Sequence, residues 1–206
     1  MRALTSALTE IALSVFAPRG CAACDAPVRI RAAFCPACAR TAVAAEDPTL
    51  APFAFGGALA EAIKRTKYGA RSDLGAVLGA LLAGELARRT TKYDLVVPVP
   101  LHPRRLAERG FNQSALIAHP VAWALGATLH TRALERVRDT PPQAKLGRLE
   151  RLGNMSGAFT ARGDLRGKRV LVVDDVVTTG ATLAACIGAL AAHGAAEVGA
   201  VAVARA

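Results

Sequence analysis

The sequence is poor in aromatic residues and has no long apolar run. Its 206 residues include six Phe, two Tyr and one Trp. No segment reaches the roughly 18 uninterrupted apolar residues that a membrane-spanning helix needs, so we expect no membrane insertion. The few aromatics also leave little room for the interleaved basic and aromatic residues typical of single-strand nucleic-acid binders. An apolar content of 52% predicts a globular protein with one full-sized core and a small appendage.

Two nucleotide-binding motifs are also missing. The chain has no G-x4-G-K-[ST] and no G-x-G-x-x-G, which excludes the P-loop and the Rossmann fingerprint. The net charge of +10 is unevenly spread, with nine Lys/Arg against four Asp/Glu between His102 and Arg151. Such a patch attracts nucleic acid, anionic membranes or phosphorylated small molecules, and the alternative is a set of solvated surface arginines. Charge alone does not choose between them.

The first 18 residues share some features with a signal peptide, namely one Arg, an apolar stretch and small residues before Pro18. Glu10, however, interrupts the would-be apolar core. Apolar residues also recur at helical spacing, at Leu4, Leu8, Ile11 and Val15. We therefore expect an amphipathic helix rather than a secretion signal, and a cytoplasmic protein.

Four of the five cysteines form the pattern C-x2-C-x10-C-x2-C, at Cys21, Cys24, Cys35 and Cys38. The sulfurs of two C-x2-C turns can surround one ion tetrahedrally, as in structural zinc sites. Four thiolates fill the Zn2+ shell and leave no position for a reactive water, so the predicted site is structural. It would fold about 30 residues that cannot build a core unaided. Disulfides are the alternative, but paired C-x2-C motifs favour a metal.

Two further residues are interpreted as packing. Cys186 lies in an apolar helical segment without basic neighbours, which is typical of a small buried hydrophobe rather than a catalytic thiol. Trp123 also lies on an apolar helix, and core packing is the expected explanation.

Residues 41–52 have the composition of a linker, which predicts a boundary between an N-terminal helix and cysteine module (1–45) and a second domain (46–206). The second domain alternates elements. We expect helices over 57–69, 73–89, 110–126 and 180–193, and strands over 93–100, 169–174 and 197–205, with Pro120 kinking the third helix or starting a new turn. Residues 100–113 are expected to form a basic loop. Alternating strands and helices with continuously apolar strands predict an α/β fold with a parallel sheet covered on both faces.

The stretch VLVVDDVVTTGAT (170–182) is the most informative motif. An apolar strand ends in Asp174 and Asp175, and a Thr-rich turn with Gly180 leads into a helix. Free N–H groups at a helix start bind phosphate, and Thr hydroxyls add donors. The two carboxylates suit sugar hydroxyls or a divalent cation. The motif therefore indicates a ribose-5-phosphate cradle, whereas its alternative, a capped helix start, needs only one capping residue.

A second segment is expected at the same place. The prolines in VPVP cannot continue a central strand, so the chain leaves the sheet there. Loops at the carboxyl ends of strands build the ligand sites of open α/β sheets. We therefore expect Asp174–Asp175 and Pro100–Arg105 to face one crevice.

These motifs, in this order, resemble the ComF/GntX-like family. The 170–182 stretch is similar to the phosphoribosyl pyrophosphate (PRPP) signature of type I phosphoribosyltransferases. The wider resemblance runs from the cysteine pairs through VPVPLHPRRLAERGFNQ and RVRDTPPQAKLGRLERLGNMSGAF to the terminal GAAEVGAVAVAR. It covers nearly the whole chain. It implies a type I phosphoribosyltransferase-like fold with a small N-terminal four-cysteine zinc module.

The resemblance also implies roles for residues. Asp174 and Asp175 would be catalytic and bind the ribose hydroxyls of PRPP. The 5-phosphate would lie in the turn made by Thr178, Thr179, Gly180, Ala181 and Thr182. The pyrophosphate loop would comprise Pro100, Leu101, His102, Arg104 and Arg105. The segment 136–151 would be a mobile loop over PRPP, with Lys145 and Arg148 as the expected phosphate contacts, Arg138 unranked against them, and Lys67 as a weaker candidate.

The implied reaction uses Mg2+, and an acceptor displaces pyrophosphate at the anomeric carbon. Carboxylates would stabilise the positive charge that develops on the sugar, while basic residues and metal stabilise the leaving pyrophosphate. The acceptor is not identified, and the zinc module would take the place of the acceptor-binding hood. Because family members are linked to DNA uptake in natural transformation, the alternative is a non-catalytic, PRPP-sensing competence factor that binds single-stranded DNA and partner proteins. By analogy with the fold we also expect a homodimer.

Overall fold

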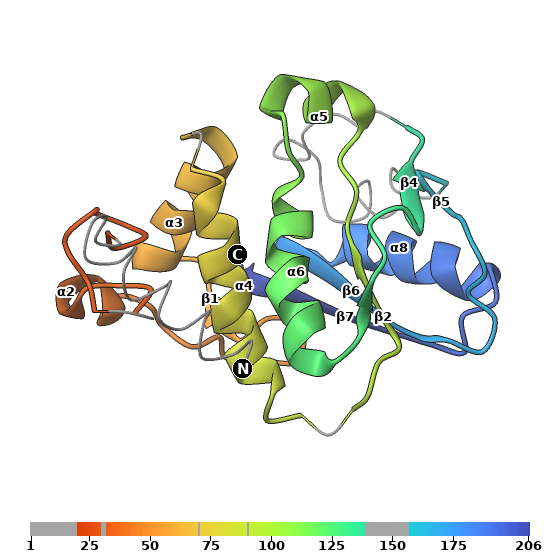
Figure 1. Ribbon diagram of the computed structural model, residues 1–206, viewed down its shortest axis with the longest axis horizontal. Helices are drawn as coiled ribbons and strands as arrows, with labels where there is room; N and C mark the ends of the chain where they lie inside the picture. The colour runs from red at the N-terminus through yellow and green to blue at the C-terminus, as the bar shows by residue number, and fades with distance from the viewer. Residues whose placement is uncertain (1–19, 30–31, 70, 90, 139–156) are drawn as a thin grey trace, which may run out of the picture.

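The computed structural model describes residues 20–29, 32–69, 71–89, 91–138 and 157–206. The predicted N-terminal amphipathic helix lies outside these residues. Figure 1 shows the elements, which in chain order are α2 (Pro36–Ala39), β1 (Phe53–Ala54), α3 (Gly57–Tyr68), α4 (Asp73–Leu86), β2 (Leu95–Pro98), α5 (Pro103–Arg109), α6 (Gln113–Leu125), β3 (Thr128–Leu129), β4 (Leu134–Arg136), β5 (Phe159–Ala161), β6 (Arg169–Val177), α8 (Ala181–Ala192) and β7 (Glu197–Arg205).

Five of the strands form one parallel sheet in the order β1-β7-β6-β2-β3, which confirms the predicted α/β class. Alternate side chains of β6 enter two separate cores. Leu171 and Val173 pack in the core that includes residues of α3, α4 and α6, whereas Val170 and Val172 pack in the core beneath α8. Because both faces are covered, the run 170–173 is apolar at every position and shows no alternation in sequence.

Helices α4 and α6 pack very closely because α4 carries glycines on the contact face. A Cβ atom at Gly79 would lie 2.4 Å from the carbonyl oxygen of Ile117, and one at Gly75 would lie 2.5 Å from the Cβ of Leu116. No residue with a side chain fits there without a shift of backbone. Helix α6 continues through Pro120 as one element, so the proline does not start a new helix. The close packing fixes where the first residues of α6 lie.

The segment 100–113 is not the loop that its composition predicted. Residues Pro103–Arg109 form α5, with Pro103 in the first turn and the His102 ring accepting the Arg104 N–H at 3.4 Å. Gly110 ends the helix in the left-handed conformation, with φ of 80°. Pro103 and Gly110 are ordinary signals for the start and end of a helix. The sequence did not predict this helix because seven residues are too few to show helical periodicity.

The cysteine module is joined to the rest of the fold by polar contacts. Asp25 pairs with Arg65 of α3 and, at 2.8 Å, with Arg71. The Thr41 hydroxyl accepts the N–H of Ala58 in the first turn of α3 at 3.0 Å. In the stretch predicted as a linker, Ala51 is fully buried. Among the described residues, no helix combines the length and apolar character needed to cross a bilayer.

Candidate functional site

The two aspartates lie within a strand rather than at its end, which corrects the prediction that the strand stops at residue 174. Pairing with β7 continues to Val177 opposite Arg205. Asp174 is 9% exposed and Asp175 is 4% exposed. Two adjacent buried carboxylates are costly unless each finds a partner. The structure supplies those partners from helices distant in sequence.

Asp174 is held by α6. The Ser114 hydroxyl donates to Oδ1 of Asp174 at 2.8 Å, and the N–H of Asp175 donates to the same atom at 2.9 Å. Burial and the nearby charge of Asp175 raise the pKa of Asp174 to about 7, because these two effects outweigh the hydrogen bonds. Sequence reasoning missed Ser114, since only the packing of α6 against β6 gives it a role.

The start of α6 is fastened to the end of β2. The side chain of Asn112 accepts the N–H of Ser114 at 3.0 Å and donates to the carbonyl of Val99 at 3.0 Å. The Val99 N–H donates to the carbonyl of Val173 at 2.9 Å. The residue before Asp174 is thereby tied to the chain that leads into the predicted pyrophosphate segment. The chain after β2 thus lies beside the middle of β6, but the predicted pyrophosphate segment and Asp174 line separate hollows.

Asp175 faces α3. The Lys67 ammonium lies 2.9 Å from Oδ2 of Asp175, at the last turn of that helix. Within the described residues no directed hydrogen bond reaches this buried oxygen. The ion pair offsets the charge while the oxygen retains acceptor capacity for a sugar hydroxyl or a metal ion. Lys67, a weaker candidate in the sequence, thus contacts one of the two aspartates.

The turn after β6 opens into α8. Gly180 has a φ of 80°, a left-handed conformation that glycine adopts without strain. The Thr179 hydroxyl accepts the N–H of Ala181 at 3.4 Å. A small hollow is lined by Asp174 and by the run 176–183, which includes every residue of the predicted phosphate turn. The first-turn N–H groups of α8 and the helix dipole suit an anion at this hollow.

The predicted pyrophosphate segment is split between two conformations. Pro100, Leu101 and His102 follow β2, whereas Arg104 and Arg105 belong to the first turn of α5. Arg104 pairs with Glu108 at 3.2 Å on an exposed surface. A hollow of about 440 Å³ lies between this segment and β4. Lys145 and Arg148 lie outside the described residues, as does most of the predicted mobile loop.

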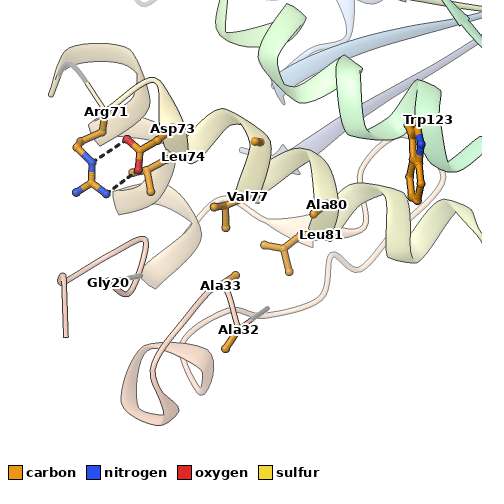
Figure 2. Close-up of a pocket in the computed structure, with 11 residues that line it drawn as sticks. Gly20, Ala32, Ala33, Arg71, Asp73, Leu74, Val77, Ala80, Leu81 and Trp123 are labelled. Atoms are coloured by element: carbon orange, nitrogen blue, oxygen red, sulfur yellow. Dashed lines mark hydrogen bonds and ion pairs between the residues drawn. The ribbon is translucent and has the colours of Figure 1, made fainter. Parts of the chain in front are cut away.

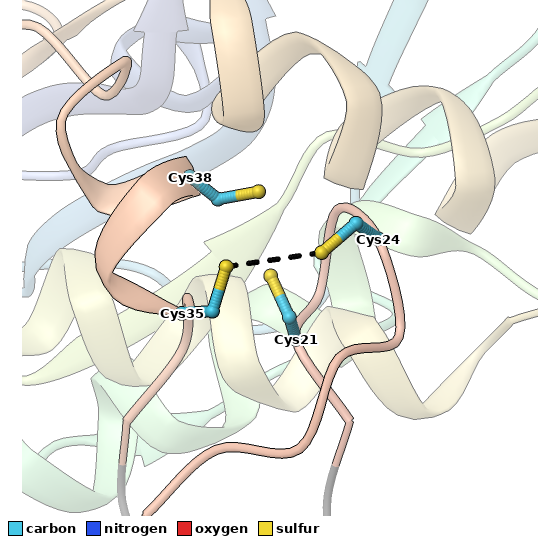
Figure 3. Close-up of side chains that lie close together, drawn as sticks. All are labelled: Cys21, Cys24, Cys35 and Cys38. Carbon is cyan, nitrogen blue, oxygen red and sulfur yellow. Dashed lines mark hydrogen bonds between the residues drawn. The ribbon is translucent and has the colours of Figure 1, made fainter.

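The four paired cysteines come together as their spacing predicts (Figure 3). Their sulfur atoms lie within 4.8 Å of one another, and those of Cys24 and Cys35 are 3.8 Å apart, too far for a disulfide bond. Burial raises the pKa of Cys21, but hydrogen bonds from the backbone of Cys35, Ala23 and Cys24 outweigh it and hold the pKa at about 6. The contact with the Cys24 side chain, by contrast, raises the pKa of Cys38 to about 12. Four sulfur atoms at this separation fit a tetrahedral zinc ion.

Burial was predicted for both Cys186 and Trp123, and only Cys186 is buried. Cys186 is fully buried as predicted, and burial raises the pKa of its thiol. Trp123 is 84% exposed, so the expectation of core packing is wrong. Helix α6 turns Ile117 and Val121 toward the core and leaves Trp123 on its outer side. A helix with apolar residues on several sides gives no sequence signal for which side is buried.

Trp123 stands beside a second hollow of about 890 Å³ (Figure 2). Val77, Ala80 and Leu81 of α4 line it, with Ala32 and Ala33 of the cysteine module opposite. The charged residues on its lining, Arg71 and Asp73, bind each other at 2.8 Å. Apart from this ion pair, the described residues of the lining are mainly apolar.

The chain is similar to known proteins over most of its length. Residues 114–206 match the model of the phosphoribosyl transferase domain. The chain is 34% identical to DNA utilization protein YhgH of Salmonella typhimurium over 86% of each protein. It is 30% identical to competence protein ComFC of Streptococcus pneumoniae, over 79% of this chain and 77% of that protein.

Among solved structures, the allosteric regulatory enzyme of purine biosynthesis aligns with a TM-score of 0.47 and 23% identity, over 66% of this chain and 29% of that one. The four-cysteine module, the parallel sheet and the near full-length similarity to curated relatives lead to one assignment. The chain belongs to the ComF/GntX-like family and has a type I phosphoribosyltransferase-like fold.

Proposed function

We propose that the protein binds PRPP with Mg2+ in the crevice of Asp174 and Asp175 and transfers the phosphoribosyl group to an acceptor. One observation carries this proposal: a buried carboxylate pair lies directly before an anion-binding turn at the start of α8. Burying two like charges destabilises the free protein. A ligand with hydroxyl groups next to a phosphate would use both halves of this arrangement.

The reaction would divide the work among the residues of the crevice. The bond from the anomeric carbon to pyrophosphate breaks, and its electron pair leaves with pyrophosphate. A lone pair of the acceptor forms the new bond, and the acceptor proton passes to solvent. Asp174 and Asp175 would hold the ribose hydroxyls and stabilise positive charge on the sugar, while the turn 178–182 would fix the 5-phosphate.

Mg2+ fits the same crevice. Asp175 Oδ2 is buried and receives no directed hydrogen bond in the described part of the chain, which leaves it able to accept from a ribose hydroxyl or a hydrated Mg2+. When bound, Mg2+ would offset the charge of the phosphate oxygens. Lys67 would hold the Asp175 carboxylate in place through their contact at 2.9 Å.

The cysteine module completes the proposal as a structural zinc site. Cys21, Cys24, Cys35 and Cys38 would hold Zn2+ through four thiolates, and no position would remain for a reactive water. Because reduced thiolates persist in a reducing compartment, the proposal includes a cytoplasmic location.

A second candidate is a non-catalytic, PRPP-sensing competence factor that binds single-stranded DNA. The relatives named for DNA utilization and competence favour it, as does the net charge of +10. Under this proposal PRPP would still occupy the crevice, but pyrophosphate would not be released. Binding to single strands would weaken as salt rises, because phosphate contacts release counterions.

Isothermal titration calorimetry with PRPP and Mg2+ tests the shared part of both candidates. We expect saturable binding to the wild type and none to the Asp174→Ala/Asp175→Ala variant. Asp164→Ala is the matched control, because Asp164 is exposed and, among the described residues, forms its ion pair with its neighbour Arg166. Equal binding to the wild type and the double variant would refute the assigned crevice.

Pyrophosphate release and strand binding separate the two candidates. Release with a candidate acceptor supports the transferase. PRPP binding without release, together with salt-sensitive retardation of labelled single-stranded DNA, supports the competence factor. Absence of retardation at low salt removes the second candidate.

A further inference from the structure

Helix α4 is apolar on all sides along most of its length. The run 74–84 contains no charged side chain and none that forms hydrogen bonds. Leu78 is fully buried in the core. The side turned away from that core also carries apolar residues, two of them exposed and two partly buried: Ala76, Val77, Ala80 and Leu81. A helix of this composition is normally covered all round, so we expect a partner for the outer side of α4.

This outer side lines the hollow of about 890 Å³, here named the outer groove, and Ala32 and Ala33 line it from the opposite side. Trp123 of α6 stands at its edge and is 84% exposed, although it is the only Trp in the chain. An apolar ring beside an apolar helix forms one continuous patch, the kind of surface that marks a contact site.

The described chain begins at one end of the outer groove. Gly20, the first described residue, lines the groove, and a Cβ atom at this position would lie 2.9 Å from the carbonyl oxygen of Asp25. Asp25 pairs at 2.8 Å with Arg71, two residues before α4 begins. Residues 1–19 therefore join the described fold at the N-terminal end of α4.

Trp123 marks the other end of the outer groove. The contacts between α4 and α6 advance in the same direction along both helices, from Gly75 beside Leu116 to Gly79 beside Pro120. Trp123 follows Pro120 by one turn and so lies toward the C-terminal end of α4. Figure 2 shows the ring on the far side of the groove from Gly20.

The segment 1–19 carries an apolar stripe of suitable length. The sequence predicts a helix with four apolar residues on one side: Leu4, Leu8, Ile11 and Val15. The stripe would span about 16 Å, and the run 73–81 of α4 spans about 12 Å. At about 100° per residue, Arg2 and Glu10 fall on the other half of the helix. Pro18 would end the helix just before the chain reaches the groove.

We propose that residues 1–19 dock in the outer groove as an amphipathic helix that runs antiparallel to α4, with the apolar stripe against α4 and the N-terminal half over Trp123. The direction follows from the two ends, because the segment joins the fold at the end of the groove opposite Trp123. The inference goes beyond the proposed function, since the described linings of this groove and of the hollow at Asp174 share no residue.

Attachment favours this segment over other occupants. A segment joined to one end of a groove is present there at a high effective concentration, whereas a second copy of the chain or another protein must be captured from solution. Docking would remove the exposed ring and the outer side of α4 from water together. It would also give the cysteine module an apolar connection to α4 in addition to the ion pair of Asp25 with Arg71.

The fluorescence of the single Trp tests docking in the full chain. We expect Trp123 of the wild type to emit at shorter wavelength than N-acetyltryptophanamide and to be less quenched by acrylamide. Leu8→Asp puts a charge on the apolar stripe and should shift the emission to longer wavelength and increase the quenching. Ser6→Asp is the matched control, because it adds the same charge on the opposite side of the predicted helix and should change neither quantity.

A substitution on the other side of the contact should have the same effect. Ala80→Asp places the charge in the outer groove, so Trp123 should become exposed as in Leu8→Asp. Ala87→Asp is its control, because Ala87 is the exposed C-cap of α4 and is absent from the described lining. Circular dichroism and zinc content show whether each variant keeps its fold.

Hydrogen exchange of the wild type gives a second measurement that needs no variant. We expect the backbone amides of residues 5–16 to be protected, and the protection to be lost in Leu8→Asp and Ala80→Asp. Emission like that of N-acetyltryptophanamide, together with unprotected amides in the wild type, would overturn the proposal even if every variant failed to fold.

Other occupants of the groove give different results. If Trp123 stays shielded in Leu8→Asp, or if its shielding in the wild type is lost on dilution, something other than the chain's own segment covers the groove and the proposal is wrong. The exchange is also measured with vesicles of phosphatidylcholine and phosphatidylglycerol. Protection of residues 5–16 that appears only with vesicles would assign the segment to a lipid surface and would equally overturn docking.

Discussion

The cysteine module and the aspartate crevice each bring ionisable side chains close together, but from different distances in the sequence. The module collects four cysteine sulfurs from two turns within 18 residues of sequence, whereas the crevice collects its charged and polar groups from α3, α6 and β6. Both are held by the last turn of α3, where Arg65 pairs with Asp25 of the module and Lys67 pairs with Asp175. A metal ion would stabilise the first arrangement directly, whereas the second would lower stability until the proposed ligand binds. The comparison indicates that the module serves the fold and the crevice serves a ligand.

The largest expected effect is loss of zinc from the module. Cys21→Ser should abolish bound zinc and lower the free energy of unfolding by several kcal/mol, because metal binding is part of the folding free energy of such sites. Metal content by mass spectrometry and thermal unfolding measure both effects. Cys186→Ala is the matched control, since Cys186 lies under α8 and should keep the zinc. Full zinc content in Cys21→Ser would contradict the site.

The second largest effect on stability is expected from a substitution between α4 and α6. Gly79→Ala puts a methyl group 2.4 Å from the Ile117 carbonyl oxygen, so we expect a loss of about 1–3 kcal/mol in stability. Displacing α6 also moves Ser114, so affinity for PRPP should fall in the same variant. Gly84→Ala on α4, where a Cβ would have open space, is the control. Equal stability of the two variants would show that α6 can move without cost.

A substitution in the aspartate crevice should raise the free energy of unfolding instead of lowering it. The pKa of Asp174 is raised to about 7 in the fold, so its contribution to stability is complete below the unfolded value near 4 and is lost as pH rises through about 7. Asn cannot ionise, so Asp174→Asn should not lose this stability as pH rises. We expect the variant to be more stable than the wild type by about 1–2 kcal/mol at pH 8, with little difference at pH 4, and to lose PRPP binding.

Urea unfolding at the two pH values gives the stabilities, and calorimetry gives the binding. If Asp174→Asn is less stable than the wild type at pH 8, the Asp174 and Asp175 carboxylates do not destabilise the fold by repelling each other. Ser114→Ala serves as a second variant, because it removes the hydroxyl that donates to Asp174 but leaves both carboxylates.

The smallest effect should come from the contact between the two regions. The Arg71 and Arg65 guanidiniums hold the pKa of Asp25 below its usual value, so this contribution is present at neutral pH and lost as pH falls through that lowered pKa. Asp25→Asn should lower Tm at neutral pH by no more than about 2 °C, since exposed ion pairs are weak. Zinc content and PRPP affinity should not change. A large fall in PRPP affinity would instead mean that the module controls the crevice through α3.

The sequence predicted features that depend on neighbouring residues. The cysteine spacing, the acidic strand and the Gly180 turn each carry their chemistry within a few positions, and the sheet followed from continuously apolar strands. Ser114 carried no such signal, because its hydroxyl gains a role only when α6 packs on β6 and brings it to Asp174. Trp123 was misjudged for the same reason: burial depends on which face of α6 meets α4.

The position of β1 in the sheet has a consequence for synthesis of the chain. Within the sheet, Phe53 of β1 pairs with Ala204 of β7, about 150 residues further along the chain. Four thiolates can gather around a metal as soon as residues 20–38 have emerged from the ribosome. The strand that follows them finds its partner only after β7 has been made. The nascent chain would therefore carry a folded N-terminal module next to unpaired apolar segments, the state in which aggregation and chaperone binding occur.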